Sequence, residues 1–222
     1  NKSKVRIQEF TNEITQWLID QKSKMIVVAC NTASSLALDY IKLKFDLPII
    51  GVIEPGIHSA ISITKNKQVG VLGTNATIKS DAYGEGLRAA NDKISVVSQP
   101  CPLFVPLVEE GWVSGDVPTA IATTYLEPIK RSNVDTLILG CTHYPLLKSI
   151  LRQILGSDVS LVDSGEATAA AVNSVLSKNN IVSNKNTGEI HCYVTDSRDS
   201  FEALAGRFVH ANISTITHVD IS

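Results

Sequence analysis

The chain alternates short apolar runs with longer segments in which apolar side chains recur at helical spacing. Between residues 7 and 19, apolar side chains stand at positions 7, 10, 14, 17 and 18, which is the pattern of an amphipathic helix. The β-branched run Met25–Ala29 follows and suits a strand that is buried on both faces of a parallel sheet. Similar runs predict further strands at Ile49–Ile53, Val69–Leu72, Ile94–Val97, Thr136–Leu139 and Ser160–Val162.

Helical patterns fill the intervals between these strands. Such an alternation of strand and helix predicts an α/β fold with mostly parallel sheets that are flanked by helices. Two late strands, Ile190–Thr195 and Ile213–Val219, are predicted around a helix at Ser200–His210. The other helices are predicted at Ala33–Phe45, Ile57–Thr64, Thr77–Ala90, Thr119–Lys130, Leu146–Leu155 and Ala167–Leu176.

A weak internal sequence repeat indicates two similar domains. The segment Ile26-Val-Val-Ala-Cys-Asn-Thr32 resembles Leu137-Ile-Leu-Gly-Cys-Thr-His143, because each is an apolar strand that ends in a cysteine before a helix. Ligands of open α/β sheets bind beyond the carboxyl ends of the strands, so two facing arrays would form a cleft. With crossovers at Glu54-Pro-Gly56 and Ser164-Gly-Glu166, we expect residues 1–54 plus 165–222 to form a discontinuous first domain and residues 55–164 the second.

The composition and charge of the chain exclude some classes of protein and of binding partner. Of the 222 residues, 44% are apolar and 19% charged, which excludes a disordered chain. Twenty basic and 22 acidic residues give a net charge of −2 without a basic patch, so we expect no nucleic-acid or membrane partner. The first residues lack the apolar core of a secretory signal, and no apolar run approaches the roughly 20 residues that span a bilayer.

The four cysteines, at positions 30, 101, 141 and 192, are widely separated. A chain of this size does not need disulfides, so we interpret them as reduced thiols of a cytoplasmic protein. No Cys-x-x-Cys pair is present, and we expect no metal site.

Two of these thiols carry candidate chemistry. Cys30 and Cys141 each stand between a predicted strand and a predicted helix, where the helix N-terminus lowers the pKa of a thiol. The simpler interpretation is that they are small buried hydrophobic residues. Two facing thiols, however, suit the transfer of a proton from one face of a carbon atom to the other, with one thiolate as base and one thiol as acid. Cys101 and Cys192 are interpreted as packing residues.

Polar residues beside these thiols are candidate substrate ligands. His143 could reprotonate or polarise Cys141, or it could be a capping or core histidine. Asn31 could orient an ammonium or carboxylate group through its amide. The hydroxyls of Thr32, Thr74, Thr77 and Thr142 are either helix caps or ligands of a substrate carboxylate, and both roles can hold together.

Five motifs, in order along the chain, resemble the cofactor-independent aspartate/glutamate racemase family. They are Ala29-Cys-Asn-Thr-Ala33, Gly51-Val-Ile-Glu-Pro-Gly56, Gly73-Thr74 with Thr77, Cys101-Pro-Leu-Phe-Val-Pro-Leu-Val-Glu109 and Gly140-Cys-Thr-His-Tyr-Pro145. The resemblance implies two α/β domains related by a pseudo-two-fold axis, with the active site in the cleft between them.

The resemblance also implies roles for individual residues. Cys30 and Cys141 would be the two catalytic acid/bases, His143 would assist Cys141, and Glu109 would support the site. Aspartate-type relatives resemble Gly-Cys-Thr-Glu where this chain has His143, which favours glutamate. The activity implied is an isomerase reaction without a cofactor that supplies D-glutamate for bacterial peptidoglycan. Family members often form dimers, so a homodimer is among the expected assemblies. The substrate ligands implied are Asn31, Thr32, Thr74, Thr77 and Thr142.

One departure from the family concerns the first residues. The family begins with a strand, an Asp-Ser-Gly motif and a later Pro-Tyr-Gly motif, and this sequence contains none of these before its first helix. The absent Asp would assist Cys30. Were Asn1 the true start, we would expect poor stability and low activity; a longer natural chain would leave the assignment intact.

Other functions remain open from sequence. A relative acting on aspartate, hydantoins or malonates is one, although two cysteines favour racemisation by two bases over decarboxylation by one. A non-catalytic amino-acid-binding domain is another. A Cys/His hydrolase lacks an oriented third group, and a pyridoxal-phosphate racemase would need a lysine at a strand end.

Overall fold

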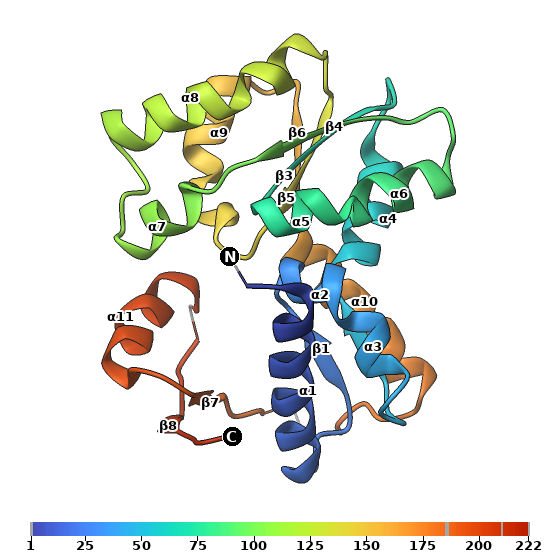
Figure 1. The fold of residues 1–222 in the computed structure, drawn as a ribbon, viewed down its shortest axis with the longest axis vertical. Coiled ribbons are helices and arrows are strands. Elements are labelled where there is room, and N and C mark those ends of the chain that lie inside the picture. The colour runs from blue at the N-terminus through green and yellow to red at the C-terminus, as the bar shows by residue number, and fades with distance from the viewer. Residues whose placement is uncertain (1, 185–186, 210, 222) are drawn as a thin grey trace.

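The computed structural model describes residues 2–184, 187–209 and 211–221, and their strands form three sheets (Figure 1). One sheet has four strands in the order β4-β3-β5-β6, and the other two pair β1 with β2 and β7 with β8. All of these pairings are parallel, which confirms the predicted α/β class. The strands are β1 (Ile26–Val28), β2 (Ile49–Gly51), β3 (Gln68–Gly73), β4 (Ser95–Pro100), β5 (Thr136–Gly140), β6 (Ser160–Asp163), β7 (His191–Val194) and β8 (Thr215–His218).

Helices connect these strands, as the spacing of apolar residues predicts. No helix among the described residues has both the length and the apolar character needed to cross a bilayer. The helices are α1 (Lys4–Asp20), α2 (Asn31–Leu36), α3 (Leu38–Lys42), α4 (Ile53–Ile63), α5 (Asn75–Ser80), α6 (Ala82–Ala90), α7 (Phe104–Glu109), α8 (Asp116–Arg131), the 3₁₀ helix η1 (Tyr144–Leu147), α9 (Lys148–Leu155), α10 (Ser164–Lys178) and α11 (Arg198–Phe208).

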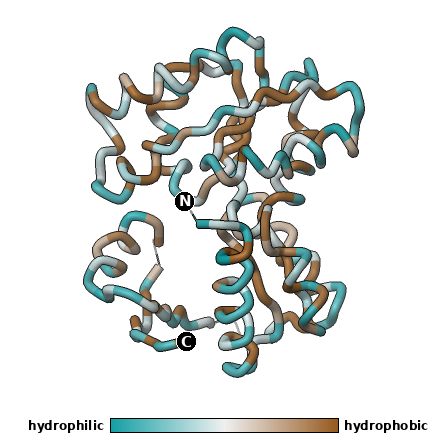
Figure 2. Tube along the Cα trace, in the orientation of Figure 1, coloured by the Kyte–Doolittle hydropathy of each residue, from teal (hydrophilic) through white to brown (hydrophobic). Residues whose placement is uncertain are grey.

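The four-stranded sheet is covered on both faces. Leu137 and Leu139 of β5 pack toward α7, α8 and α9, whereas Ile138 of the same strand packs toward α4 and α6. Alternate residues of a strand point to opposite faces, so a continuous apolar run fills both cores. Figure 2 shows the resulting hydrophobic colouring along the central strands.

The sheet of β1 and β2 is smaller and more open. Ile26 and Val28 are buried with Ile41 and Ile49, but Val27 between them is 40% exposed. The expectation that this run is buried on both faces is therefore wrong for Val27. Helices α2 and α3 pack on one side of this two-stranded sheet, and the other side of Val27 borders a hollow.

Several predicted boundaries differ from the structure for local reasons. The single helix predicted over Ala33–Phe45 is interrupted at Ala37, and the one over Thr77–Ala90 is interrupted at Asp81, which adopts φ +53°. Residue Ile53 was predicted to end a strand, but it begins α4. Pro55 falls in the first turn of this helix, where proline is tolerated. The crossovers expected at Glu54-Pro-Gly56 and Ser164-Gly-Glu166 are thus the first turns of α4 and α10. Residue His210, the predicted end of the last helix, lies outside the described residues.

Candidate active site

The two candidate catalytic thiols stand at the carboxyl ends of strands from different sheets. Cys30 follows β1, is the N-cap residue of α2 and is exposed. Cys141 follows β5 and is only 6% exposed. Negative charge on Cys30 raises the pKa of Cys141, so the two sulfur atoms lie within electrostatic reach of each other. The fold therefore brings together two thiols that are distant in the sequence.

The environment of Cys141 differs from the one expected from sequence. Burial raises the pKa of its thiol to about 11, although the backbone N–H of His143 and the Thr142 hydroxyl counteract this. The expected lowering by a helix N-terminus is wrong here, because a turn and the 3₁₀ helix η1 follow Cys141 rather than an α-helix. A raised pKa favours the protonated form of the Cys141 thiol at neutral pH.

His143 lies between Cys141 and an acidic side chain. Its Nδ1 is 3.9 Å from Sγ of Cys141 and 3.2 Å from Oγ1 of Thr142. Its buried Nε2 is 3.3 Å from Oε1 of Glu109, which is ion-pair distance, but the two atoms lack the alignment of a hydrogen bond. The carboxylate of Glu109 also raises the pKa of Cys141. The structure thus places the predicted His143 and Glu109 in one chain of contacts that ends at the Cys141 thiol.

The C-terminal helix α11 completes this side of the site. The ring of Phe208 meets the ring of His143 edge to face at a centroid distance of 5.6 Å. Arg207 donates hydrogen bonds of 2.9 Å to the backbone carbonyls of Val108 and Glu109. Sequence reasoning missed both residues, because nothing in the local pattern of α11 indicates contact with residues so distant in the chain.

Three threonine hydroxyls meet where α2 faces α5. Oγ1 of Thr32 lies 2.9 Å from that of Thr74 and 3.2 Å from that of Thr77, and the latter two are 3.1 Å apart. Among them only Thr74 is a helix cap, since its hydroxyl accepts from the backbone N–H of Thr77. Thr32 and Thr77 lie within the first turns of α2 and α5; Thr32 is half-buried, whereas Thr77 is buried and its hydroxyl contacts the two other threonines. Thr142 stands apart from this group, in the turn beside Cys141.

Asn31 contributes an unpaired donor. The residue is 2% exposed, and Oδ1 accepts a 2.7 Å hydrogen bond from the Tyr83 hydroxyl. Its Nδ2 is buried without a partner. An unsatisfied buried donor is costly unless a ligand supplies the acceptor, which makes Asn31 a candidate for carboxylate binding. Tyr83 was not identified from the sequence.

The two other thiols have surroundings that suit packing. Cys101 is fully buried, its thiol lies 3.6 Å from the carbonyl of Gln99, and burial raises its pKa. The hydroxyl of Tyr144 donates to the carbonyl of Cys101 at 2.9 Å. Cys192 is half-buried in β7.

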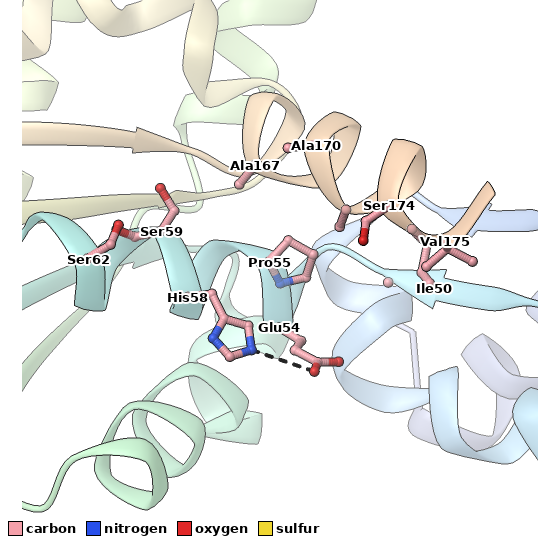
Figure 3. Close-up of a pocket in the computed structure, with 12 residues that line it drawn as sticks. Ile50, Glu54, Pro55, His58, Ser59, Ser62, Ala167, Ala170, Ser174 and Val175 are labelled. Atoms are coloured by element: carbon pink, nitrogen blue, oxygen red, sulfur yellow. Dashed lines mark hydrogen bonds and ion pairs between the residues drawn. The ribbon is translucent and has the colours of Figure 1, made fainter. Parts of the chain in front are cut away.

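The structure has two hollows of interest here, of which the first borders the site. One of about 320 Å³ is lined by Val27, Ala29, Thr142 and Ser164 among others, next to both catalytic candidates. Another of about 520 Å³ lies between α4 and α10, where the ion pair of Glu54 and His58 faces away from the small side chains of α10 (Figure 3). This second hollow contains none of the predicted site residues. Among the described residues no cluster of three His, Cys, Asp or Glu side chains is arranged to hold a metal ion.

Comparison with known proteins identifies the class to which this arrangement belongs. The model of the Asp/Glu/Hydantoin racemase family matches residues 3–172, and this chain belongs to that family. The resemblance inferred from the five motifs is thereby confirmed. The class is one of isomerases that act on amino acids and related compounds.

Particular relatives are more specific than the family. A glutamate racemase of Geobacter metallireducens is 39% identical over 221 residues, which are 99% of this chain and 82% of the relative. The crystal structure of glutamate racemase isoform RacE1 from Bacillus anthracis superposes with a TM-score of 0.94 at 35% identity, covering 99% of this chain and 82% of that one. The Francisella tularensis glutamate racemase in complex with D-glutamate gives a TM-score of 0.93 at 35% identity, over 100% and 83%.

Proposed function

We propose that this chain is a cofactor-independent racemase that interconverts L- and D-glutamate by two-base proton transfer between Cys30 and Cys141. The observation that carries the proposal is the placement of these two thiols at the carboxyl ends of β1 and β5, with negative charge on Cys30 raising the pKa of Cys141. The kinship with glutamate racemases supports the choice of substrate.

The proposed reaction conserves protons and needs no electron carrier. A thiolate on one face removes the α-proton, so the Cα–H bond breaks and an S–H bond forms. The opposite thiol then gives its proton to the other face, so that its S–H bond breaks and a new Cα–H bond forms. Because the Cys141 thiol is protonated at neutral pH, it is the donor in the direction that starts at Cys30.

The reverse direction requires Cys141 to lose its proton first. His143 is placed for this task, because its Nδ1 lies 3.9 Å from Sγ. A proton taken up by His143 leaves a positive charge that the nearby Glu109 carboxylate stabilises at 3.3 Å. These two residues are thus proposed to set the protonation state of Cys141 between turnovers.

Binding groups surround the reacting carbon in this proposal. The unpaired Nδ2 of Asn31, the hydroxyls of Thr32, Thr74 and Thr77, and Thr142 beside Cys141 supply donors for the two carboxylates of glutamate. Donors held in place before the reaction also stabilise the negative charge that spreads onto the α-carboxylate when the α-proton leaves.

The wider assignment follows from this activity. We propose that the substrate is bound between a first domain of residues 1–54 plus 165–222 and a second of residues 55–164. The reaction would supply D-glutamate for peptidoglycan in the cytoplasm, without nucleic-acid or membrane partners. A homodimer is compatible with the proposal but not required by it, since one chain provides every group named above.

Chiral chromatography tests the activity directly. With L-glutamate and no added cofactor, D-glutamate should accumulate until the two enantiomers are equal, because they have the same free energy in water. L-aspartate should remain unchanged in a parallel reaction. Conversion of aspartate alone would transfer the assignment to an aspartate racemase, and binding of glutamate without inversion would favour a non-catalytic amino-acid-binding domain.

A further inference from the structure

The Asn31 side chain is held by one partner only. Its Oδ1 accepts from the Tyr83 hydroxyl at 2.7 Å, whereas its Nδ2 is buried without a partner. The two ends of an amide are chemically different, since the oxygen accepts and the NH₂ group donates. Whatever fixes the orientation of this amide therefore decides whether the site offers a donor or an acceptor to a ligand.

Tyr83 is suited to fix that orientation. It is 3% exposed, and burial raises the pKa of its phenol well above the usual value, so the group keeps its proton. The Ser164 side chain interacts with the same hydroxyl, at the start of α10. In the structure this phenol gives its proton to Oδ1 of Asn31, while the Ser164 hydroxyl donates to the carbonyl of Leu139. In the flipped amide the NH₂ group would donate to the phenol oxygen, and Oδ1 instead of Nδ2 would then be the atom left without a partner.

Two glycines keep the phenol ring in place. A Cβ atom built on Gly56 would come within 3.2 Å of Cε1 of Tyr83, and one on Gly140 within 3.1 Å of Cε2. On Gly140 it would also meet the carbonyl oxygen of Leu72 at 2.6 Å. The ring thus lies close against both glycines, and a side chain at either position would crowd it. Gly56 is the last residue of one motif noted in the sequence, and Gly140 is the first residue of another. Their contact with the Tyr83 ring gives both glycines a physical role.

We propose that Tyr83 is a positioning residue that orients the Asn31 amide, so that its NH₂ group is presented to a substrate carboxylate. The proposal rests on the assignment of Asn31 to the substrate site. It also connects two parts of the molecule, because Tyr83 belongs to α6 and Asn31 to α2.

The variant Tyr83→Phe removes the hydroxyl and keeps the ring in place. We expect the KM for glutamate to rise about tenfold, with a smaller change in kcat, because the amide loses its preferred orientation before binding. The matched control is Tyr125→Phe. The Tyr125 hydroxyl takes part in one hydrogen bond, which it accepts from the backbone N–H of Leu103 at 3.3 Å, and its ring packs edge-on against Phe104. The control should keep the wild-type KM, and equal KM values for the two variants would overturn the proposal.

A double-mutant cycle separates positioning from a general structural effect. Tyr83→Phe should have no further effect on KM in the Asn31→Ala background, because there is then no amide left to orient. An undiminished effect in that background would mean that Tyr83 acts independently of Asn31. The variant Asn31→Asp supplies a check that does not depend on Tyr83→Phe folding. Its carboxylate still accepts from Tyr83 but has no NH₂ group and repels a substrate carboxylate, so its KM should be at least as high as that of Asn31→Ala, and a wild-type KM would overturn the proposal.

A measurement without substrate keeps this inference separate from the proposed function. In ¹³C,¹⁵N-labelled protein, the side-chain carbonyl and NH₂ signals of Asn31 are assigned by their absence in Asn31→Ala. Both should shift in Tyr83→Phe and stay in place in Tyr125→Phe. Unchanged signals in Tyr83→Phe would contradict the positioning role. Absence of racemisation by the wild-type chain would count against the proposed function, whereas these signals would still decide the role of Tyr83.

Discussion

Oε1 of Glu109 lies 3.3 Å from Nε2 of His143, on the side of the imidazole opposite the Cys141 thiol. Glu109 is the last residue of α7, and Arg207 of α11 holds its backbone carbonyl. The carboxylate acts on the site in two ways, since it faces the histidine and also raises the pKa of Cys141. A half-exposed acidic residue is thereby connected through His143 to a buried thiol.

The variant Glu109→Gln tests this relationship. We expect kcat to fall about fivefold, or ~1 kcal/mol, because the positive charge on His143 loses a partner that is partly screened by solvent. The loss of a negative charge near Cys141 should also lower the pKa of its thiol and move the pH–rate profile to lower pH. Steady-state kinetics between pH 6 and 10 measures both effects. Glu110→Gln, at the exposed neighbouring carboxylate, is the control, and an identical profile for the two variants would refute the role of Glu109.

The threonine group predicts a combined loss of stability and binding. Thr74→Ala removes the cap of α5 and two of the three contacts among the hydroxyls. Loss of a cap costs ~1 kcal/mol in the free energy of unfolding, and we expect the KM for glutamate to rise as well. Thr123→Ala is the control, because that hydroxyl only bonds to the carbonyl of Thr119 on an exposed face of α8. Urea unfolding and kinetics decide the matter, and a KM equal to that of the control would exclude Thr74 from binding.

The protein should lose stability at alkaline pH. Cys141 has a folded-state pKa of about 11, against 9.0 for an unperturbed thiol, so the folded state holds this proton more tightly than the unfolded chain does. The stabilisation is complete below pH 9 and is lost as the pH rises toward 11, with an upper limit of about 3 kcal/mol for this thiol. Burial raises the pKa of Cys101, Tyr83 and Tyr144 too, and these groups change stability in the same direction.

Urea unfolding of the wild type and of Cys141→Ala at pH 7, 9 and 10.5 measures this contribution. The difference in unfolding free energy between the two proteins should shrink as the pH rises. A difference that is constant across this range would mean that the Cys141 thiol titrates alike in the folded and unfolded states.

Much of the fold follows from local sequence patterns. The runs at Val69–Leu72 and Thr136–Leu139 form buried strands, because continuous apolar residues satisfy both faces of a covered parallel sheet. Interruptions such as the left-handed Asp81 were not predicted, since apolar spacing continues across the break. Helix periodicity reports which face is buried and not whether every backbone hydrogen bond is formed.

The candidate site, like the fold, could be predicted from the sequence only in part. Cys30, Cys141 and His143 could be selected from sequence, because strand ends and short spacings are local features. Tyr83 and Phe208 could not, since their contacts with Asn31 and His143 depend on how distant helices pack. The direction of the pKa shift of Cys141 was missed for a related reason. The sequence shows the residues that follow a thiol but not how deeply the thiol is buried.

Exchange of the α-proton in D₂O tests the central claim most directly, because it reports removal of the proton on each face. The wild-type chain is incubated separately with L- and D-glutamate, and the α-proton signal is followed by NMR. Cys30→Ser, Cys141→Ser and the control Cys192→Ser are treated in the same way, and chiral chromatography measures inversion alongside. The account predicts loss of the signal from both enantiomers for the wild type and the control, and inversion reduced at least about 100-fold in the other two variants. Inversion at the wild-type rate in either Cys30→Ser or Cys141→Ser would contradict the two-base mechanism.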